Sequence, residues 1–135
     1  MTYTYSGSVQ EAVYARLVAD TALNALVNGA IYDAVPVNAE GLYVTLGEER
    51  VRDFSTKTSY GGVHTFSVLV HAAEEGFESV KAAGKAVCEA LIDAPLTLSE
   101  GVLVGLRFVL ARADRGDLPA RRTVTLQFRA VVDQA

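Results

Sequence analysis

The side chains that could perform chemistry in this 135-residue sequence are few and far apart. The only two histidines, His64 and His71, lie seven positions apart on one predicted strand. Because alternate residues of a strand point to opposite faces, the two imidazoles cannot share a metal ion. No other histidine could complete a ligand set, so we expect no metal site and no cofactor. His64 is expected at a loop edge and His71 on the surface near the end of the strand.

Nucleophilic and acid–base catalysis have no better candidates. The single cysteine, Cys88, lies beside Val87 and Leu91 on a predicted helix, where a small buried thiol is expected. The GxSxG sequence of a serine nucleophile does not occur. Adjacent carboxylates occur at Glu48-Glu49 and Glu74-Glu75. The first two would point apart on a strand, and the second two resemble the acidic bias of a helix N-terminus.

A polar segment, DFSTKTSYGGVH from Asp53 to His64, separates two hydrophobic stretches. A phosphate-binding loop of the GxxxxGK[ST] type places its lysine after the glycines and joins a strand to a helix. Here Lys57 precedes Gly61 and Gly62, and the segment joins two predicted strands. Nucleotide binding is therefore not expected. A lid over a site, a loop that docks on another protein and a solvated hairpin tip all remain open at this point.

The composition favours a protein with apolar surface to bury. Hydrophobic residues make up 50% of the chain and charged residues 21%, which indicates buried surface beyond the core of the fold. The formal net charge of −4 argues against nucleic-acid binding through a broad basic face, because such binding depends on neutralising phosphates. An acidic surface would let DNA slide past without sticking, although mild acidity is also common among bacterial cytosolic proteins.

The sequence predicts neither a signal peptide nor a membrane span. The N-terminal stretch MTYTYSGSVQ has no basic region and no apolar core. The strongest apolar stretch, Val102–Ala111, is interrupted by Arg107 and is much shorter than the roughly 20 residues that cross a bilayer. We therefore expect a soluble protein that is made in a cytosol and has no membrane partner.

The N-terminal part of the chain is predicted to be helical. Ser8 and Glu11 fit a capping box that would start a helix, and Asp20 is expected to interrupt or re-cap it. Asn28-Gly29 is a typical signal for the end of a helix. A short strand is expected at Ile31–Asp33.

A long hairpin should follow, with the polar segment at its tip. Strict alternation along its first strand, Leu42–Phe54, would bury three charged side chains. We therefore predict a bulge near Gly47, after which Val51 takes the inner face. The second strand of the hairpin is expected at Val63–Ala72.

A second main helix and two strands complete the domain. The helix is expected from Glu74 to about Ala94, and strands follow at Val102–Ala113 and Arg122–Val132. The strand from Val102 is apolar on both faces and is predicted to be central, whereas the strand from Arg122 alternates cleanly. We predict one α+β domain over residues 1–135, with a mainly antiparallel sheet of four to five strands and two main helices on one face.

The segment Ala30–Val70 resembles the tail-completion or tail-terminator family of long-tailed phages. The similarity lies in an IYD-x-VP segment, a YVTLG strand, a D-x-S-x-K segment and a G-x-x-H-x-F strand. It continues through the second helix to Gly105–Phe108 and Gln127–Ala130, and so covers essentially the whole chain. The sequence looks most like the version in gene transfer agents of alphaproteobacteria, phage-derived particles that package host DNA. These motifs are structural rather than catalytic.

The resemblance implies a structural virion protein that is not an enzyme. A ring of copies, expected to be a hexamer, would cap the tail tube, stop its polymerisation and join the neck of the filled head. DNA would pass through the lumen. The implied partners are other copies of the chain, the major tail tube protein, a neck or stopper protein and, transiently and without sequence specificity, DNA. The protein would lie at the tail–neck junction of a particle assembled in the bacterial cytoplasm.

Within this resemblance, the polar segment becomes a docking loop between rings or subunits. Its members are Ser55, Thr56, Lys57, Thr58, Ser59, Tyr60, Gly61 and Gly62. A mildly acidic lumen would repel DNA phosphates and keep passage fast, with Glu48, Glu49 and Asp53 as candidates. Two alternatives stay open: a neck or head-closure connector of the same particle, and a small ligand-binding or enzymatic domain, which would need a concave pocket with convergent polar groups.

Overall fold

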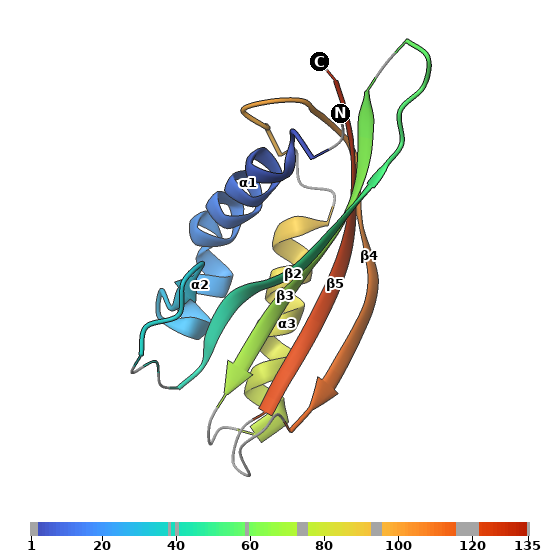
Figure 1. Ribbon diagram of the computed structural model, residues 1–135. Coiled ribbons are helices and arrows are strands. Elements are labelled where there is room, and N and C mark those ends of the chain that lie inside the picture. Colours follow the sequence, from blue (N-terminus) through green and yellow to red (C-terminus); the bar gives the residue numbers. More distant parts are fainter. Residues whose placement is uncertain are drawn as a thin grey trace.

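A five-stranded sheet carries the fold, and three helices cover one of its faces (Figure 1). The computed structural model describes residues 3–37, 39, 41–58, 60–72, 76–92, 96–115 and 122–134. The helices are α1 (Ser6–Ala19), α2 (Thr21–Val27) and α3 (Gly76–Leu91), and the strands are β1 (Ile31–Tyr32), β2 (Tyr43–Asp53), β3 (Gly61–Ala72), β4 (Val102–Asp114) and β5 (Arg122–Asp133). This architecture confirms the predicted α+β class. The face of the sheet turned away from the helices is called the open face below.

The strand order is β1-β2-β3-β5-β4, and every pair except β1–β2 is antiparallel. The middle strand, β3, pairs with β5 along its whole length and with β2 on its other side. Among the described residues, no helix is long and apolar enough to cross a membrane.

The helix boundaries confirm two predicted signals and contradict a third. Asp20 caps α2 by accepting a hydrogen bond from a backbone N–H of its first turn, and Asn28 ends that helix in the left-handed conformation (φ 55°). The capping box predicted at Ser8 is wrong, because α1 begins at Ser6 and no side chain caps it. The Ser8 hydroxyl instead accepts from the Glu100 amide at 3.0 Å and donates to the Glu100 carbonyl at 2.9 Å.

The bulge predicted in β2 is present. Leu46 pairs with Val68, whereas Glu49 pairs with Phe66. Over this interval β2 therefore contains one more residue than β3. The extra residue keeps the arginines of β2 on the open face and gives the inner face to Val51, as expected. Without it, alternation would turn charged side chains into the core.

The core lies between the inner face of the sheet and the helices. Val80, Val87 and Leu91 of α3 are fully buried there, and their spacing forms an apolar stripe along the helix. The predicted ends of this helix at Glu74 and Ala94 lie outside the described residues. On the sheet, Phe128 is fully buried and stacks on Phe66, with ring centroids 5.6 Å apart.

The strand that was predicted to be central lies at the edge of the sheet. β4 pairs with β5 on one side only. Five of the twelve large hydrophobic side chains that are exposed in the described residues lie on β4. They are Val102, Val104, Phe108, Val109 and Leu110. The prediction was wrong because an apolar composition shows that a strand avoids water but does not show which strand lies beside it.

The position of β4 is fixed by the turn that precedes it. The Ser8 hydroxyl, on α1, holds the backbone of Glu100, and Gly101 follows with a positive φ of 85°. A Cβ at Gly101 would lie 2.9 Å from the Tyr5 ring and 3.0 Å from a methyl carbon of Val132. The turn therefore requires glycine for both its conformation and its close packing.

We predict that Gly101→Ala destabilises the protein by at least about 1–2 kcal/mol, the cost of placing a Cβ in the left-handed region. Gly105→Ala is the matched control, since that glycine also lies in the β4 region but its φ is not positive and an added Cβ would meet no atom within 4 Å. Urea denaturation of the two variants measures the difference. Equal free energies of unfolding would contradict the role assigned to Gly101.

Candidate interaction surfaces

The loop between β2 and β3, residues 54–60, is held firmly at its base. The Phe54 N–H donates to the carbonyl of Gly61 at 2.9 Å, which continues the strand pairing past Asp53. Ser55 Oγ donates to the Asp53 carboxylate at 2.6 Å, and the Ser55 N–H donates to the same oxygen at 3.1 Å. The pKa of Asp53 is lowered below its usual value, mainly by the hydrogen bond that its carboxylate accepts from the Ser55 hydroxyl.

The tip of this loop projects beyond the sheet, at the end of the molecule where both termini lie (Figure 1). Phe54 and Tyr60 are 60% and 56% exposed, and residues 56–58 are exposed as well. The chain near the C-terminus steadies the loop, because Gln134 donates its N–H to the Tyr60 carbonyl and its side-chain oxygen accepts the Tyr60 N–H. A fixed base with an exposed aromatic and polar tip is suited to contact a partner.

The predicted docking residues do not all lie in this loop. The structure places Ser55, Thr56, Lys57, Thr58 and Tyr60 there, and Ser59 lies outside the described residues. Gly61 and Gly62 are buried residues of β3. A Cβ at Gly61 would come within 3.0 Å of a β5 carbonyl oxygen, so this glycine permits close strand pairing.

The predicted lumen acids also lie in different surroundings. Glu48 is exposed in the bulge of β2, and Asp53 is exposed at the end of the strand. Glu49 is half-buried on the inner side, where its carboxylate accepts a hydrogen bond from Ser6 Oγ at 2.6 Å. The three carboxylates therefore do not form one cluster.

A buried histidine lies next to Glu49. His64 was expected at a loop edge, but its side chain is fully buried, because it shares the inner face of β3 with Phe66. Its Nδ1 lies 3.7 Å from a Glu49 carboxylate oxygen, and neither ring nitrogen has a hydrogen-bond partner within the described part of the chain. Burial lowers the pKa of His64 from its usual 6.5, although the Glu49 charge opposes that shift. Neutral imidazole is therefore the stable form near pH 7.

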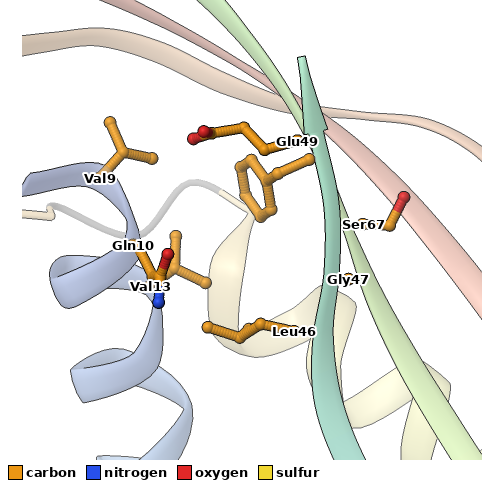
Figure 2. Close-up of a pocket in the computed structure, with 8 residues that line it drawn as sticks. Val9, Gln10, Val13, Leu46, Gly47, Glu49 and Ser67 are labelled. Atoms are coloured by element: carbon orange, nitrogen blue, oxygen red, sulfur yellow. The ribbon is translucent and has the colours of Figure 1, made fainter. Parts of the chain in front are cut away.

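The space around Glu49 is too small for a ligand. Figure 2 shows the Glu49 side chain between β2 and α1, facing Val9. The cavity is lined by Val9, Gln10, Val13, Leu46, Gly47, Glu49, Phe66 and Ser67 and has a volume of about 30 Å³. That volume has room for one or two water molecules.

The second histidine, His71, has a different environment on the open face. Its Nε2 lies 3.0 Å from the Thr45 hydroxyl, and its ring stacks on Tyr43 with centroids 4.8 Å apart. It is half-buried rather than fully on the surface. The two histidines thus lie on opposite faces of the sheet, as their spacing predicts, and the described residues contain no cluster of three or more groups that could hold a metal ion.

The open face carries arginines that the linear sequence does not bring together. Arg50 pairs with Thr65, Thr65 with Arg129, and Arg129 with Arg107, so that one row crosses four strands. Arg52 lies near this row and lines a shallow depression of about 430 Å³ together with Arg50 and Arg129. None of these four arginines forms an ion pair with another described residue. Directly opposed like charges are unfavourable in a sheet, so the row does not stabilise the fold.

A groove on the inner side separates α3 from β4. It has a volume of about 330 Å³, with an apolar floor and two lysines, Lys81 and Lys85, among its lining residues. Phe108 and Cys88 also line it. Burial raises the pKa of the Cys88 thiol, which opposes formation of the reactive thiolate. Sequence reasoning missed this groove because it follows from the edge position of β4.

We predict that His64 makes the protein less stable in mild acid. Because its pKa is lower in the folded state than in the unfolded chain, the unfolded chain binds the proton first as the pH falls below about 6.5. The free energy of unfolding should therefore decrease between about pH 7.5 and pH 5.5. His64→Leu should remove this slope and stay within about 1 kcal/mol of the parent near pH 7.5, since it removes two unsatisfied ring nitrogens.

Denaturation across this pH range provides the measurement. His71→Gln is the control, and it should keep the slope because His64 remains in place. A slope of unchanged size in His64→Leu would assign the pH dependence to other groups.

Known proteins resemble this chain over nearly its whole length. The sequence matches the family described as tail completion protein gp17 over residues 11–133. The fold is similar to a chain of a solved structure described as the virion of a native gene transfer agent (GTA) particle. That similarity has a TM-score of 0.92 and 48% sequence identity, and it covers 97% of this chain and 98% of the other. No curated protein matches the sequence. The chain therefore belongs to the tail completion protein gp17 family.

Proposed function

We propose that the protein is a structural virion component that completes the tail of a phage-derived particle of the gene transfer agent type. The observation that carries this proposal is the likeness of the whole chain to a protein of such a particle, together with its family membership. The protein would be assembled in the bacterial cytoplasm and would lie at the tail–neck junction. A role in architecture also agrees with a His64 that is buried and a Cys88 whose thiol resists ionisation.

In this proposal the copies form a closed ring, expected to be a hexamer, that ends the tail tube and joins the neck. DNA passes through the lumen without sequence-specific contacts. The exposed apolar side chains of Val102–Leu110 supply surface for lateral contacts. A monomeric protein rarely exposes so many apolar side chains on one strand. Residues 124–132 of β5, the other surface considered for such contacts, alternate between buried and half-buried positions and contribute mainly to the core.

The lumen acids in this proposal are Glu48 and Asp53, whose carboxylates are exposed. Glu49 is a weaker candidate, since it is already engaged by Ser6 beside His64. A lumen that also included the open face would present the arginine row, and passage of DNA would then depend on a balance between the two signs of charge.

Electron microscopy of the parent particle tests the proposal directly. We expect several copies of the chain in a closed ring between the tail tube and the neck. A single copy, or a position away from this junction, would overturn the proposal. A ring on the head side of the neck would instead favour the head-closure connector.

The loop between β2 and β3 should be required for assembly but not for folding. We predict that replacing Ser55–Tyr60 by a two-residue Asn-Gly turn leaves the domain folded, because a short turn can hold the hairpin register and loop length has little effect on closure entropy. Assembly should fail, since the exposed groups of the tip no longer reach a neighbour. The expected phenotype is DNA-filled heads beside unjoined or overlong tails, seen by electron microscopy. Normal particles would show that the loop is only a solvated tip.

A single charge at the tip allows a milder test. Lys57 is exposed and forms no ion pair within the described residues. We predict that Lys57→Glu lowers the yield of joined particles without changing the melting temperature, because it reverses one contact charge and leaves the backbone intact. Lys57→Arg is the control and should give the yield of the parent. Equal yields from both variants would remove Lys57 from the contact.

A further inference from the structure

The outer edge of β4 has the composition of a strand that is covered on both sides. Its backbone N–H and C=O groups beyond β5 meet no other strand of the described chain. Natural edge strands are usually short or carry charges and proline that discourage pairing. β4 carries Arg107, Arg112 and Asp114 and has two bulges against β5, but it is 13 residues long and has no proline. It exposes Val102, Val104, Phe108, Val109 and Leu110. Covering this edge would remove five apolar side chains from water.

The opposite edge of the sheet is open over a defined interval. β1 pairs only with Val44 and Thr45 of β2. From Gly47 to Asp53, β2 has a partner on the β3 side and no second strand beyond it among the described residues. One molecule therefore carries two different free edges, one on β4 and one on the distal half of β2.

The directions of these two edges match. β2, β3, β5 and β4 follow one another across the sheet, and each neighbouring pair is antiparallel. β2 and β4 consequently run in opposite directions. Copies related by rotation about a ring axis keep the same sense along that axis, so β4 of one copy would meet β2 of the next in antiparallel orientation. A contact between two different surfaces, repeated around an axis, closes into a ring.

Gly105 leaves open space on this edge strand. Glycine in a strand costs about 0.5–1 kcal/mol relative to alanine, and it often marks the close approach of another backbone. The φ of Gly105 is not positive, and a Cβ there would meet no atom within 4 Å. No steric contact within the described residues requires glycine at this position on the open face of β4, although Gly105 directly follows a bulge of β4 against β5, which is another setting in which strands use glycine.

We propose that β4 pairs antiparallel with residues 47–53 of β2 in a second copy of this chain, so that the sheets of neighbouring copies become one continuous sheet. This inference rests on the ring in the proposed function and names the two surfaces that join its subunits. Backbone hydrogen bonds then satisfy both free edges. The apolar side chains of β4 are covered by the neighbour, and Gly105 leaves space that a small side chain can enter and an arginine cannot.

Disulfide crosslinking in assembled particles tests the pairing. In a Cys88→Ser background, Gly105→Cys is combined in turn with Glu48→Cys, Arg50→Cys and Arg52→Cys, which together sample the possible registers. We expect at least one combination to give a ladder of multimers of this chain after mild oxidation. The control combines Gly105→Cys with Glu11→Cys, an exposed position on α1, and should give none.

The outcomes separate this inference from the proposed function. Particles treated with a lysine-reactive crosslinker show whether copies are neighbours at all. Multimers with that reagent but no disulfide ladder would overturn the strand pairing and leave the ring intact. Failure of both would overturn the ring as well. A disulfide product with a chain of different mass would show that another virion protein covers β4.

A second variant tests the pairing without crosslinking. Gly105→Arg should leave the melting temperature of the isolated chain nearly unchanged, because the position is open, and should reduce incorporation into particles at least tenfold. Gly105→Ala should be incorporated at close to the parent level. Normal incorporation of Gly105→Arg would overturn the close approach at this position.

Discussion

One extra residue in β2 sets the direction of the side chains that follow it in that strand. Alternation in a strand has a period of two, so a single insertion exchanges the inner and open faces. In this protein the insertion comes between Leu46 and Glu49. It lets one continuous strand be apolar toward the helices in its first half and charged toward the open face in its second half. The contact of half-buried Glu49 with His64 depends on it, and so does the arginine row.

The sequence alone could predict those parts of the fold that depend on local pattern. The bulge follows from charges that strict alternation would bury, the α2 boundaries from Asp20 and Asn28, and the strand β5 from its regular alternation. His64 is instructive, because the period of two correctly places it on the face opposite to His71, where Phe66 also lies. The polarity of histidine then led to the wrong expectation of exposure.

The order of strands and the contacts across them could not be predicted in this way. The sequence of β4 resembles that of a central strand because it is hydrophobic on both faces. Hydrophobicity shows that a strand is shielded from water but does not show which neighbour shields it. The row from Arg50 to Arg107 requires the register of four strands, which no local pattern contains. The serine at position 8 fits a capping box, yet a distant backbone at Glu100 binds it instead.

The arginine row has a consequence for how the isolated chain behaves in solution. Arg129 and Arg107 are directly opposed on neighbouring strands, at a Cα separation of about 5 Å, whereas the Debye length at physiological ionic strength is about 8 Å. Repulsion between their guanidinium groups is therefore strongest in dilute buffers and weakens as salt is added, even though the whole chain carries a net charge of −4. The repulsion acts on β4, the strand that presents the free edge. Dissolved anions that bind to the row would reduce this repulsion, so the behaviour of the isolated chain should depend on the salt in which it is kept.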